Sequence, residues 1–175
     1  LTNIGSDLIS SKSALTALSF VYKGEPQYSF ECLTAFAGAT ISWIENNLNL
    51  INDPKDSERI SLELEDNGGV YVIPAFAGLS APYWLPSAKA MFYGITAATN
   101  FKHIVRASLE SVAYQIAAYL EYIQKNEKID ISKIIIDGGM TNNSFLMQLI
   151  SNLSQKEISI PLFPDMSSYG SLLMG

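Results

Sequence analysis

The segment from Ile134 to Leu149, IIIDGGMTNNSFLMQL, constrains the fold more than any other part of the chain. Its three isoleucines predict a buried strand, and the apolar residues after the asparagines recur at helical spacing. The strand enters the helix through Gly138-Gly139 after only a short turn. A strand joined so tightly to a helix is typical of α/β proteins. Paired glycines at the joint also indicate close approach of a ligand to the main chain, or a positive φ angle.

This turn is a candidate binding site. Backbone N–H groups at the start of the helix and the helix macrodipole favour an anion or the polar rim of a nucleotide. Asn142 or Asn143 can cap the helix or contact a ribose or a base. A tight turn with an asparagine cap and no ligand fits the stretch equally well. The glycine spacing is neither that of the dinucleotide fold nor that of a phosphate loop.

The rest of the chain alternates between strand and helix patterns, each bounded by turn residues. Pro26 is expected to precede the second strand of a hairpin, and Asn100 to cap the longest helix. The first helix is predicted from an apolar stripe of Leu33, Ala37, Ile41, Ile44 and Leu48. The expected strands are 15–21, 27–30, 70–73, 91–95, 133–136 and 157–160, and the expected helices are one ending near 46, a short one within 51–69, one from 101 to 123, 142–154, and a last one after 166. This order predicts an α/β fold with a mixed sheet and helices on both faces.

Composition excludes several classes of function. The chain has 175 residues, the length of one domain or of one full domain with a fragment of another. Its net charge of −6 comes without a basic stripe, so we expect no nucleic-acid partner and no anionic membrane partner. Cys32 is the only cysteine, which excludes an internal disulfide and favours a reducing cytoplasm. No apolar run reaches the ~18 residues that a membrane span needs.

Three further stretches carry candidate residues, and for each a structural role is the commoner one. Gly38 lies inside a helical pattern, where packing explains a glycine more often than a ligand does. The loop AFAGLSAPYWLP is typical of a rigid connector. His103, Arg106 and Glu110 share one polar helix face. We find no nucleophile constellation, no paired carboxylates and no metal cluster, so the chain is predicted to hold a ligand and to supply no catalytic or metal-ligating residue.

Read together, these stretches resemble the C-terminal domain of the FGGY carbohydrate kinases, and within that family the members that phosphorylate glycerol. The span Ala90–Glu110 is similar to the family signature, with Phe92, Gly94-Ile95, His103-Ile104 and Ala107–Glu110 at matching positions. PAFAGLSAPYW, AGATISWI and DGGMTNNSFLMQ are similar to three further segments of the family. The similarity extends along nearly the whole chain in one order.

The resemblance implies an actin-like ATPase (ribonuclease H-like) fold, in which two α/β domains close over a cleft. Residues 1–175 would then be the C-terminal nucleotide-binding domain, truncated at both ends, and the N-terminal sugar-binding and catalytic domain would precede them. In the family, the residues matching Gly38, Gly139 and Asn143 contact ATP or ADP. The implied nucleotide site comprises Gly38, Ser42, Gly138, Gly139 and Asn143.

The resemblance also implies an activity. The intact protein would transfer the γ-phosphate of ATP to a small polyol, glycerol first, with Mg²⁺ held through the ATP phosphates and acids of the missing domain. The polyol would bind through that domain too, and the isolated fragment would be inactive. The location would be cytoplasmic, and the oligomeric state stays open, a homo-oligomer included.

Several positions depart from the family pattern. Ser42 stands where a nucleotide-contacting glutamine is usual, Leu85 replaces an acid, Lys89 an arginine and Ala90 a glycine. Near the end, Asp165 and Gly170 are retained in an otherwise altered motif. These departures leave three alternatives open: a kinase for xylulose, ribulose or gluconate, a pseudokinase that binds nucleotide without turnover, and an interaction domain without a ligand.

Overall fold

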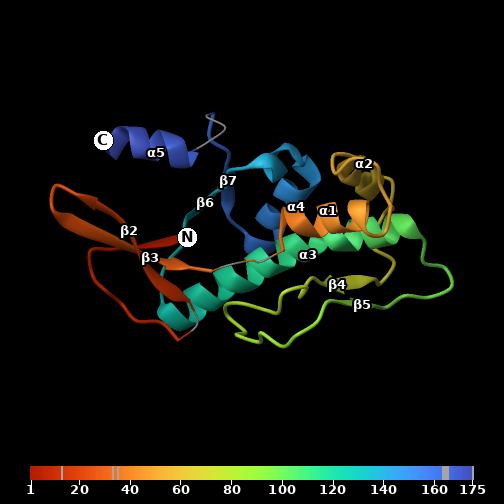
Figure 1. Ribbon diagram of the computed structural model, residues 1–175, viewed down its shortest axis with the longest axis horizontal. Coiled ribbons are helices and arrows are strands. Elements are labelled where there is room, and N and C mark those ends of the chain that lie inside the picture. The colour runs from red at the N-terminus through yellow and green to blue at the C-terminus, as the bar shows by residue number, and fades with distance from the viewer. Residues whose placement is uncertain (13, 33, 35, 163–165, 175) are drawn as a thin grey trace.

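A computed structural model describes residues 1–12, 14–32, 34, 36–162 and 166–174 (Figure 1). Leu33 and Asp165, which the sequence patterns included, lie outside the described residues. The elements are β1 Thr2–Gly5, β2 Leu15–Tyr22, β3 Glu25–Glu31, α1 Gly38–Asn46, α2 Asp56–Leu62, β4 Tyr71–Ile73, β5 Met91–Tyr93, α3 Phe101–Tyr122, the π-helical η1 Ile123–Glu127, β6 Lys133–Ile135, the 3₁₀-helical η2 Gly139–Asn142, α4 Ser144–Ser154, β7 Glu157–Ser159 and α5 Met166–Met174.

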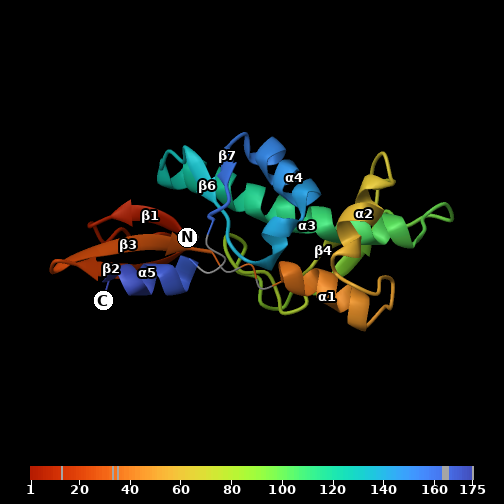
Figure 2. The same ribbon diagram turned by 90° about the horizontal axis from the view of Figure 1, so that it is seen from above.

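Helix α3 is the element against which most others pack. Asn100 caps it as predicted: its side chain accepts a hydrogen bond from the Lys102 N–H, while His103 Nδ1 accepts one from the Asn100 N–H. Helices α1, α2 and α4 lie on one side of α3 and the β4–β5 pair on the other (Figures 1 and 2). The three-stranded sheet lies near the C-terminal end of α3 (Figures 1 and 2), where Phe30 and Tyr119 belong to one buried cluster.

The main core lies between α3 and the helices that carry the candidate site. Leu109 on α3, Ile44 on α1 and Leu146 on α4 are buried in one cluster with Ile60 of α2. Burying such aliphatic side chains stabilises the fold by about 1.5–3 kcal/mol each. The relative positions of α1, α2 and α4 are therefore fixed by hydrophobic packing on α3.

The expected α/β class is confirmed, but the described strands do not form one mixed sheet. They pair as three separate sheets: β1-β3-β2, which is antiparallel; β4-β5, also antiparallel; and β6-β7, which is parallel. Among the described residues, no helix combines the length and the apolar character that crossing a bilayer requires.

Four details differ from the sequence expectations. Pro26 lies inside β3, opposite Val21 of β2. It is tolerated because β1 pairs only with residues 28–30 of β3, so at Pro26 the strand has one neighbour. Leu48 lies beyond the end of α1 and is exposed, so it is not part of the apolar stripe. Strand β1 had no predicted counterpart.

The fourth difference concerns β6, which was expected to be buried. Ile135 is 67% exposed, and Ile134 and Ile136 are only half-buried against the core. The strand is exposed because, among the strands that the structure describes, it pairs with β7 alone, and because its residues also line a cavity.

The polar face of α3 is a buried network rather than a solvated surface. Arg106 Nε donates to Glu110 Oε1 at 2.8 Å, and the two side chains are only 13% and 6% exposed. Glu110 Oε2 accepts from Asn67 Nδ2 at 2.7 Å and from the Tyr114 hydroxyl at 3.2 Å. Burial, followed by the nearby Glu110 charge, raises the pKa of Tyr114 to about 12. The ion pair is thus surrounded by donors that satisfy its carboxylate.

Replacing Glu110 with alanine should lower the free energy of unfolding by about 3–5 kcal/mol, because it leaves the Arg106 guanidinium buried and unpaired. Replacing Glu157 with alanine should lower the free energy of unfolding by less than about 1 kcal/mol, because its ion pair with Lys133 is exposed. Urea unfolding of both variants of the intact protein measures the difference. Equal losses would show that the buried pair has no special role.

Candidate functional site

A cavity of about 430 Å³ opens between α1, the start of α2 and the joint that leads from β6 into α4. Its walls come from three segments that are far apart in the sequence. The lining residues are Gly38, Ile41, Ser42, Asp53, Pro54, Lys55, Ser57, Glu58, Gly139, Met140, Asn142 and Asn143. Apolar surface and a smaller number of polar groups therefore enclose a volume large enough for a small organic ligand.

Four of the five predicted site residues line this one cavity. Gly38 and Ser42 lie one turn apart on α1, Gly139 begins η2, and Asn143 caps α4. Gly138 is outside the lining and instead borders a neighbouring cavity of about 280 Å³. The structure thus brings together residues separated by about a hundred positions in the chain.

The two paired glycines are needed for different reasons. Gly138 has φ 101° and ψ 175°, a backbone conformation that is essentially restricted to glycine. Gly139 has no positive φ, and a Cβ built on it would meet no atom within 4 Å. The backbone conformation of the turn requires a glycine at position 138. At position 139 the glycine leaves main chain, without a side chain, facing the open volume of the cavity.

Gly38 has a packing role as well as a place in the cavity. A Cβ added at Gly38 would lie 3.2 Å from Met140 Sδ and 3.4 Å from Met140 Cγ. The glycine therefore allows Met140 of η2 to lie close against α1. The packing explanation expected from the sequence holds, and it brings two walls of the cavity into contact.

Asn143 serves as the cap of α4, one of the two roles that the sequence allowed. Its Oδ1 accepts from the Leu146 N–H at 2.9 Å, which satisfies a free donor of the first helical turn. Its Nδ2 makes a longer hydrogen bond of 3.4 Å to Ser57 Oγ, across to α2. Helix α4 consequently begins at Ser144, not at Asn142 as predicted.

Glu58 is a cavity residue that the sequence did not single out. Its Oε1 accepts from the Ser144 N–H at 2.9 Å and also from the Ser144 hydroxyl. The hydroxyl of Ser144, together with the backbone N–H groups of Ser144 and Phe145, lowers the pKa of the Glu58 carboxyl. An acidic side chain from α2 thus occupies the positive N-terminus of α4.

The start of α4 is consequently less open to an anion than the sequence indicated. Glu58 uses the Ser144 N–H, and Asn143 uses the Leu146 N–H. With these donors already engaged, a phosphate has little to bind there, and the carboxylate of Glu58 would repel it. The geometry suits an uncharged, hydrogen-bonding ligand group better.

Five lining residues come from the connection in which a short helix was expected: Asp53, Pro54, Lys55, Ser57 and Glu58. A helix-start pattern is present there, since Asp-Pro is followed by acids in the first turn. That pattern predicts the short helix, which is confirmed. It does not predict which element the first turn faces.

The other candidate stretches have structural roles. The ring centroid of Phe76, in the proline-rich loop, lies 4.9 Å from that of Phe36 and 4.5 Å from that of Trp43. The loop therefore packs against α1. His103 belongs to the cap of α3. Neither stretch contributes to the lining of the cavity.

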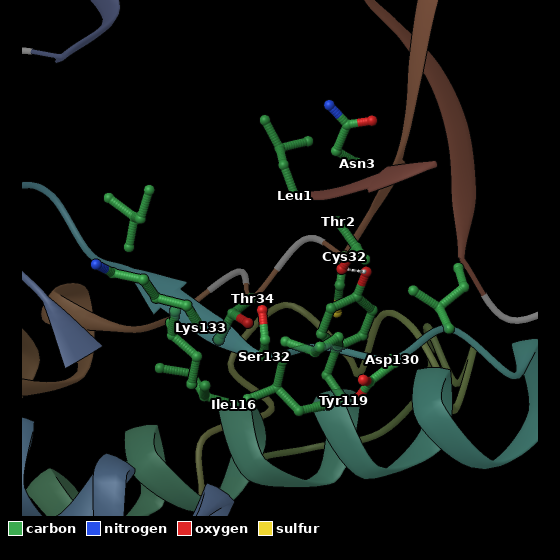
Figure 3. Close-up of a pocket in the computed structure, with 15 residues that line it drawn as sticks. Leu1, Thr2, Asn3, Cys32, Thr34, Ile116, Tyr119, Asp130, Ser132 and Lys133 are labelled. Atoms are coloured by element: carbon green, nitrogen blue, oxygen red, sulfur yellow. Dashed lines mark hydrogen bonds between the residues drawn. The ribbon is translucent and has the colours of Figure 1, made fainter. Parts of the chain in front are cut away.

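A second cavity, of about 380 Å³, lies between β1 and β6 (Figure 3). Cys32, Tyr119 and Lys133 are among its lining residues, and no predicted site residue is. The Cys32 thiol donates to the Ala81 carbonyl at 3.2 Å, and burial raises its pKa. Tyr119 donates to the Phe30 carbonyl at 3.3 Å. These polar groups bond within the protein, so this cavity is the weaker candidate.

Metal ligands are a separate question. Within the part of the chain that the structure describes, no three His, Cys, Asp or Glu side chains lie close enough together to hold a metal ion. The cavity carries the carboxylates of Asp53 and Glu58, and that of Glu58 is engaged by Ser144. The described residues do not fit a resident metal site.

Solved structures show the same fold. The crystal structure of Plasmodium falciparum glycerol kinase with ADP superposes with a TM-score of 0.89 at 32% identity, over 99% of this chain and 35% of that one. A ligand-bound xylulose kinase from Lactobacillus acidophilus superposes with a TM-score of 0.76 at 19% identity, over 89% of this chain and 32% of that one. The chain therefore has the α/β fold of the actin-like ATPases.

The chain belongs to the FGGY family of carbohydrate kinases, whose C-terminal domain it matches over residues 6–175. It is 42% identical to a glycerol kinase of Clostridium perfringens and 39% identical to one of Haemophilus influenzae, in each case over 98% of this chain and 34% of the relative. The family resemblance drawn from the motifs is confirmed. The chain spans about a third of the length of these relatives.

The two glycines of the turn give a matched test of their roles. Replacing Gly138 with alanine should lower the free energy of unfolding by about 1–3 kcal/mol, because alanine is strained at φ 101°. Replacing Gly139 with alanine should leave stability nearly unchanged. Denaturant unfolding measures both, and a Gly139→Ala loss as large as that of Gly138→Ala would contradict these roles.

Proposed function

We propose that this chain is the nucleotide-binding domain of an ATP-dependent polyol kinase, with glycerol as the first candidate substrate. The intact protein would transfer the γ-phosphate of ATP to a primary hydroxyl and release ADP. The polyol and the catalytic base would be held by a preceding N-terminal domain, and residues 1–175 would be the C-terminal domain. The cytoplasm, where ATP is available, is the proposed location.

One observation carries this proposal: Gly38, Ser42, Gly139 and Asn143 line a single cavity. The sequence patterns indicate Gly38, Gly139 and Asn143 as candidate residues, and the family resemblance adds Ser42. Two further findings support it: the matched glycerol kinases, and the 0.89 TM-score to one whose crystal structure contains ADP.

The adenosine part of the nucleotide fits this cavity better than the phosphates do. Gly139 offers main chain without a side chain, and Ile41 and Met140 offer apolar contacts to a flat base. The Glu58 carboxylate at the start of α4 disfavours a phosphate there. The phosphates would therefore extend out of the cavity towards the sugar-binding domain.

ATP would enter as its magnesium complex, with Mg²⁺ held through the phosphates and by acids outside this chain. The ion would neutralise phosphate charge during transfer. The contribution of this domain would be to bind and orient the nucleoside, and to close over the reactants so that water is excluded.

A pseudokinase is the second candidate, and Ser42 is the observation that favours it. Ser42 lines the cavity where family members usually carry a glutamine that contacts the nucleotide, and its side chain is shorter. A protein of this kind would bind ADP but show no phosphorylation of glycerol. Measuring turnover and ADP binding on the same preparation separates the two candidates.

Replacing Gly139 with valine should weaken ADP binding by about tenfold or more, which corresponds to about 1.4 kcal/mol. The new side chain would stand in space that the nucleoside needs, because a Cβ at Gly139 meets no protein atom within 4 Å. Calorimetry with ADP on the intact protein measures the change. Gly139→Ala, which adds one methyl group, controls for the backbone effect. Unchanged ADP affinity in the valine variant would contradict the proposed site.

Purified residues 1–175 should show no ATP-dependent phosphorylation of glycerol, because the proposed base and polyol pocket lie outside them. A coupled ADP-release assay with and without glycerol measures this. Glycerol-dependent turnover by the fragment would overturn the proposed division of labour.

A further inference from the structure

Two polar contacts hold α2 against the start of α4 at the cavity wall. They join Ser57 and Glu58 of α2 to Asn143, the cap of α4, and to Ser144, its first residue. Ser144 donates through its backbone N–H, at 2.9 Å, and through its hydroxyl to Glu58 Oε1. Asn143 Nδ2 donates to Ser57 Oγ at 3.4 Å. Ser57 in turn donates to the Pro54 carbonyl at 2.6 Å. The first turn of α2 therefore contacts the start of α4.

These contacts bear directly on the proposed nucleotide contacts. Ser144 is the residue after Asn143, and Asn143 and Gly139 both line the cavity. A shift of the α4 start would move Asn143 and the η2 turn together, because Asn143 donates its N–H to the Met140 carbonyl at 3.1 Å. Whatever fixes Ser144 consequently fixes the cavity wall.

The Glu58–Ser144 contact is the stronger of the two. The Glu58 carboxylate accepts two hydrogen bonds from one residue at a helix N-terminus, and charge-assisted bonds of this kind are roughly twice as strong as neutral ones. The Asn143–Ser57 bond is long and neutral by comparison. Removal of the carboxylate should therefore loosen the start of α4.

We propose that Glu58 is a positioning residue for the nucleotide: it fixes the start of α4, and with it Asn143 and the Gly139 turn, without contacting the nucleotide itself. The inference rests on the proposed function, because it assumes that ADP binds in this cavity. The family resemblance implies residues that contact the nucleotide. Glu58 is a residue of another kind, because it holds the site in its binding conformation before the ligand arrives.

The test is calorimetry of the intact protein with ADP and with 2′-deoxy-ADP. Glu58→Ala should weaken ADP binding about tenfold, since it removes both hydrogen bonds to Ser144. Glu58→Gln should stay within about threefold of the wild type, because the amide oxygen still accepts from the Ser144 N–H. Glu65→Ala is the control, since Glu65 is exposed, lies just beyond α2 and does not line the cavity.

The deoxynucleotide separates positioning from direct contact. If Glu58 acts through α4, Glu58→Ala weakens ADP and 2′-deoxy-ADP by the same factor. If Glu58 instead bonds the ribose 2′-hydroxyl, the variant loses only the preference for ADP, and the proposal is wrong. Wild-type ADP affinity in Glu58→Ala also overturns it. If Glu58→Ala fails to fold, Ser144→Ala is the substitute variant, because it keeps the backbone N–H but lacks the hydroxyl that bonds Glu58. Ser144→Ala should bind ADP more weakly than the wild type, and unchanged ADP affinity in this variant counts against the proposal.

The proposed function and this inference fail differently. If the wild-type protein does not bind ADP, the cavity is not a nucleotide site and both fall. If the wild type binds ADP and Gly139→Val weakens it, while Glu58→Ala does not, the site stands and only the positioning role is wrong.

Discussion

The guanidinium group of Arg106 on α3 contacts two of the elements that form the candidate site, α2 and α4. It pairs with the buried Glu110 on α3. Its Nη1 donates to the carbonyl of Ser61 in α2, at 3.0 Å, and to that of Leu64, which follows α2. It also lies 5.1 Å from the ring centroid of Phe145 in the first turn of α4, within cation–π range. One buried charge thus relates α2 and α4 to α3, and the two walls of the cavity depend on it.

This arrangement gives the family signature a structural meaning. The signature residues His103 and Glu110 belong to the cap and to the buried network of α3, where Glu110 pairs with Arg106, and none of the three lines the cavity. Residues that define the family by sequence therefore support the proposed nucleotide site from a distance. The residues proposed to contact the nucleotide lie on α1 and at the start of α4, whose positions the network and the apolar core fix.

Much of the fold could be predicted from the sequence, because its elements follow local patterns. The cap at Asn100, the short helix α2 and the strand–turn–helix at Gly138 each depend on residues close together in the chain. What the sequence could not reveal depends on distant neighbours. Strand β6 is exposed because it has one partner strand within the described part of the chain. Glu58 matters only because α2 faces α4. Sequence patterns and the family resemblance together predicted four residues of the cavity. The five residues from the 53–58 segment could be assigned to it only from the structure.

The claim that most needs testing is the position of the nucleoside. A crystal of the intact protein soaked with ADP tests it directly. We expect density for adenosine in the cavity between α1, α2 and α4, with the main chain of Gly139 against it and the phosphates leading outward. An ordered ADP elsewhere, with this cavity empty or closed by side chains, would contradict the placement of the site.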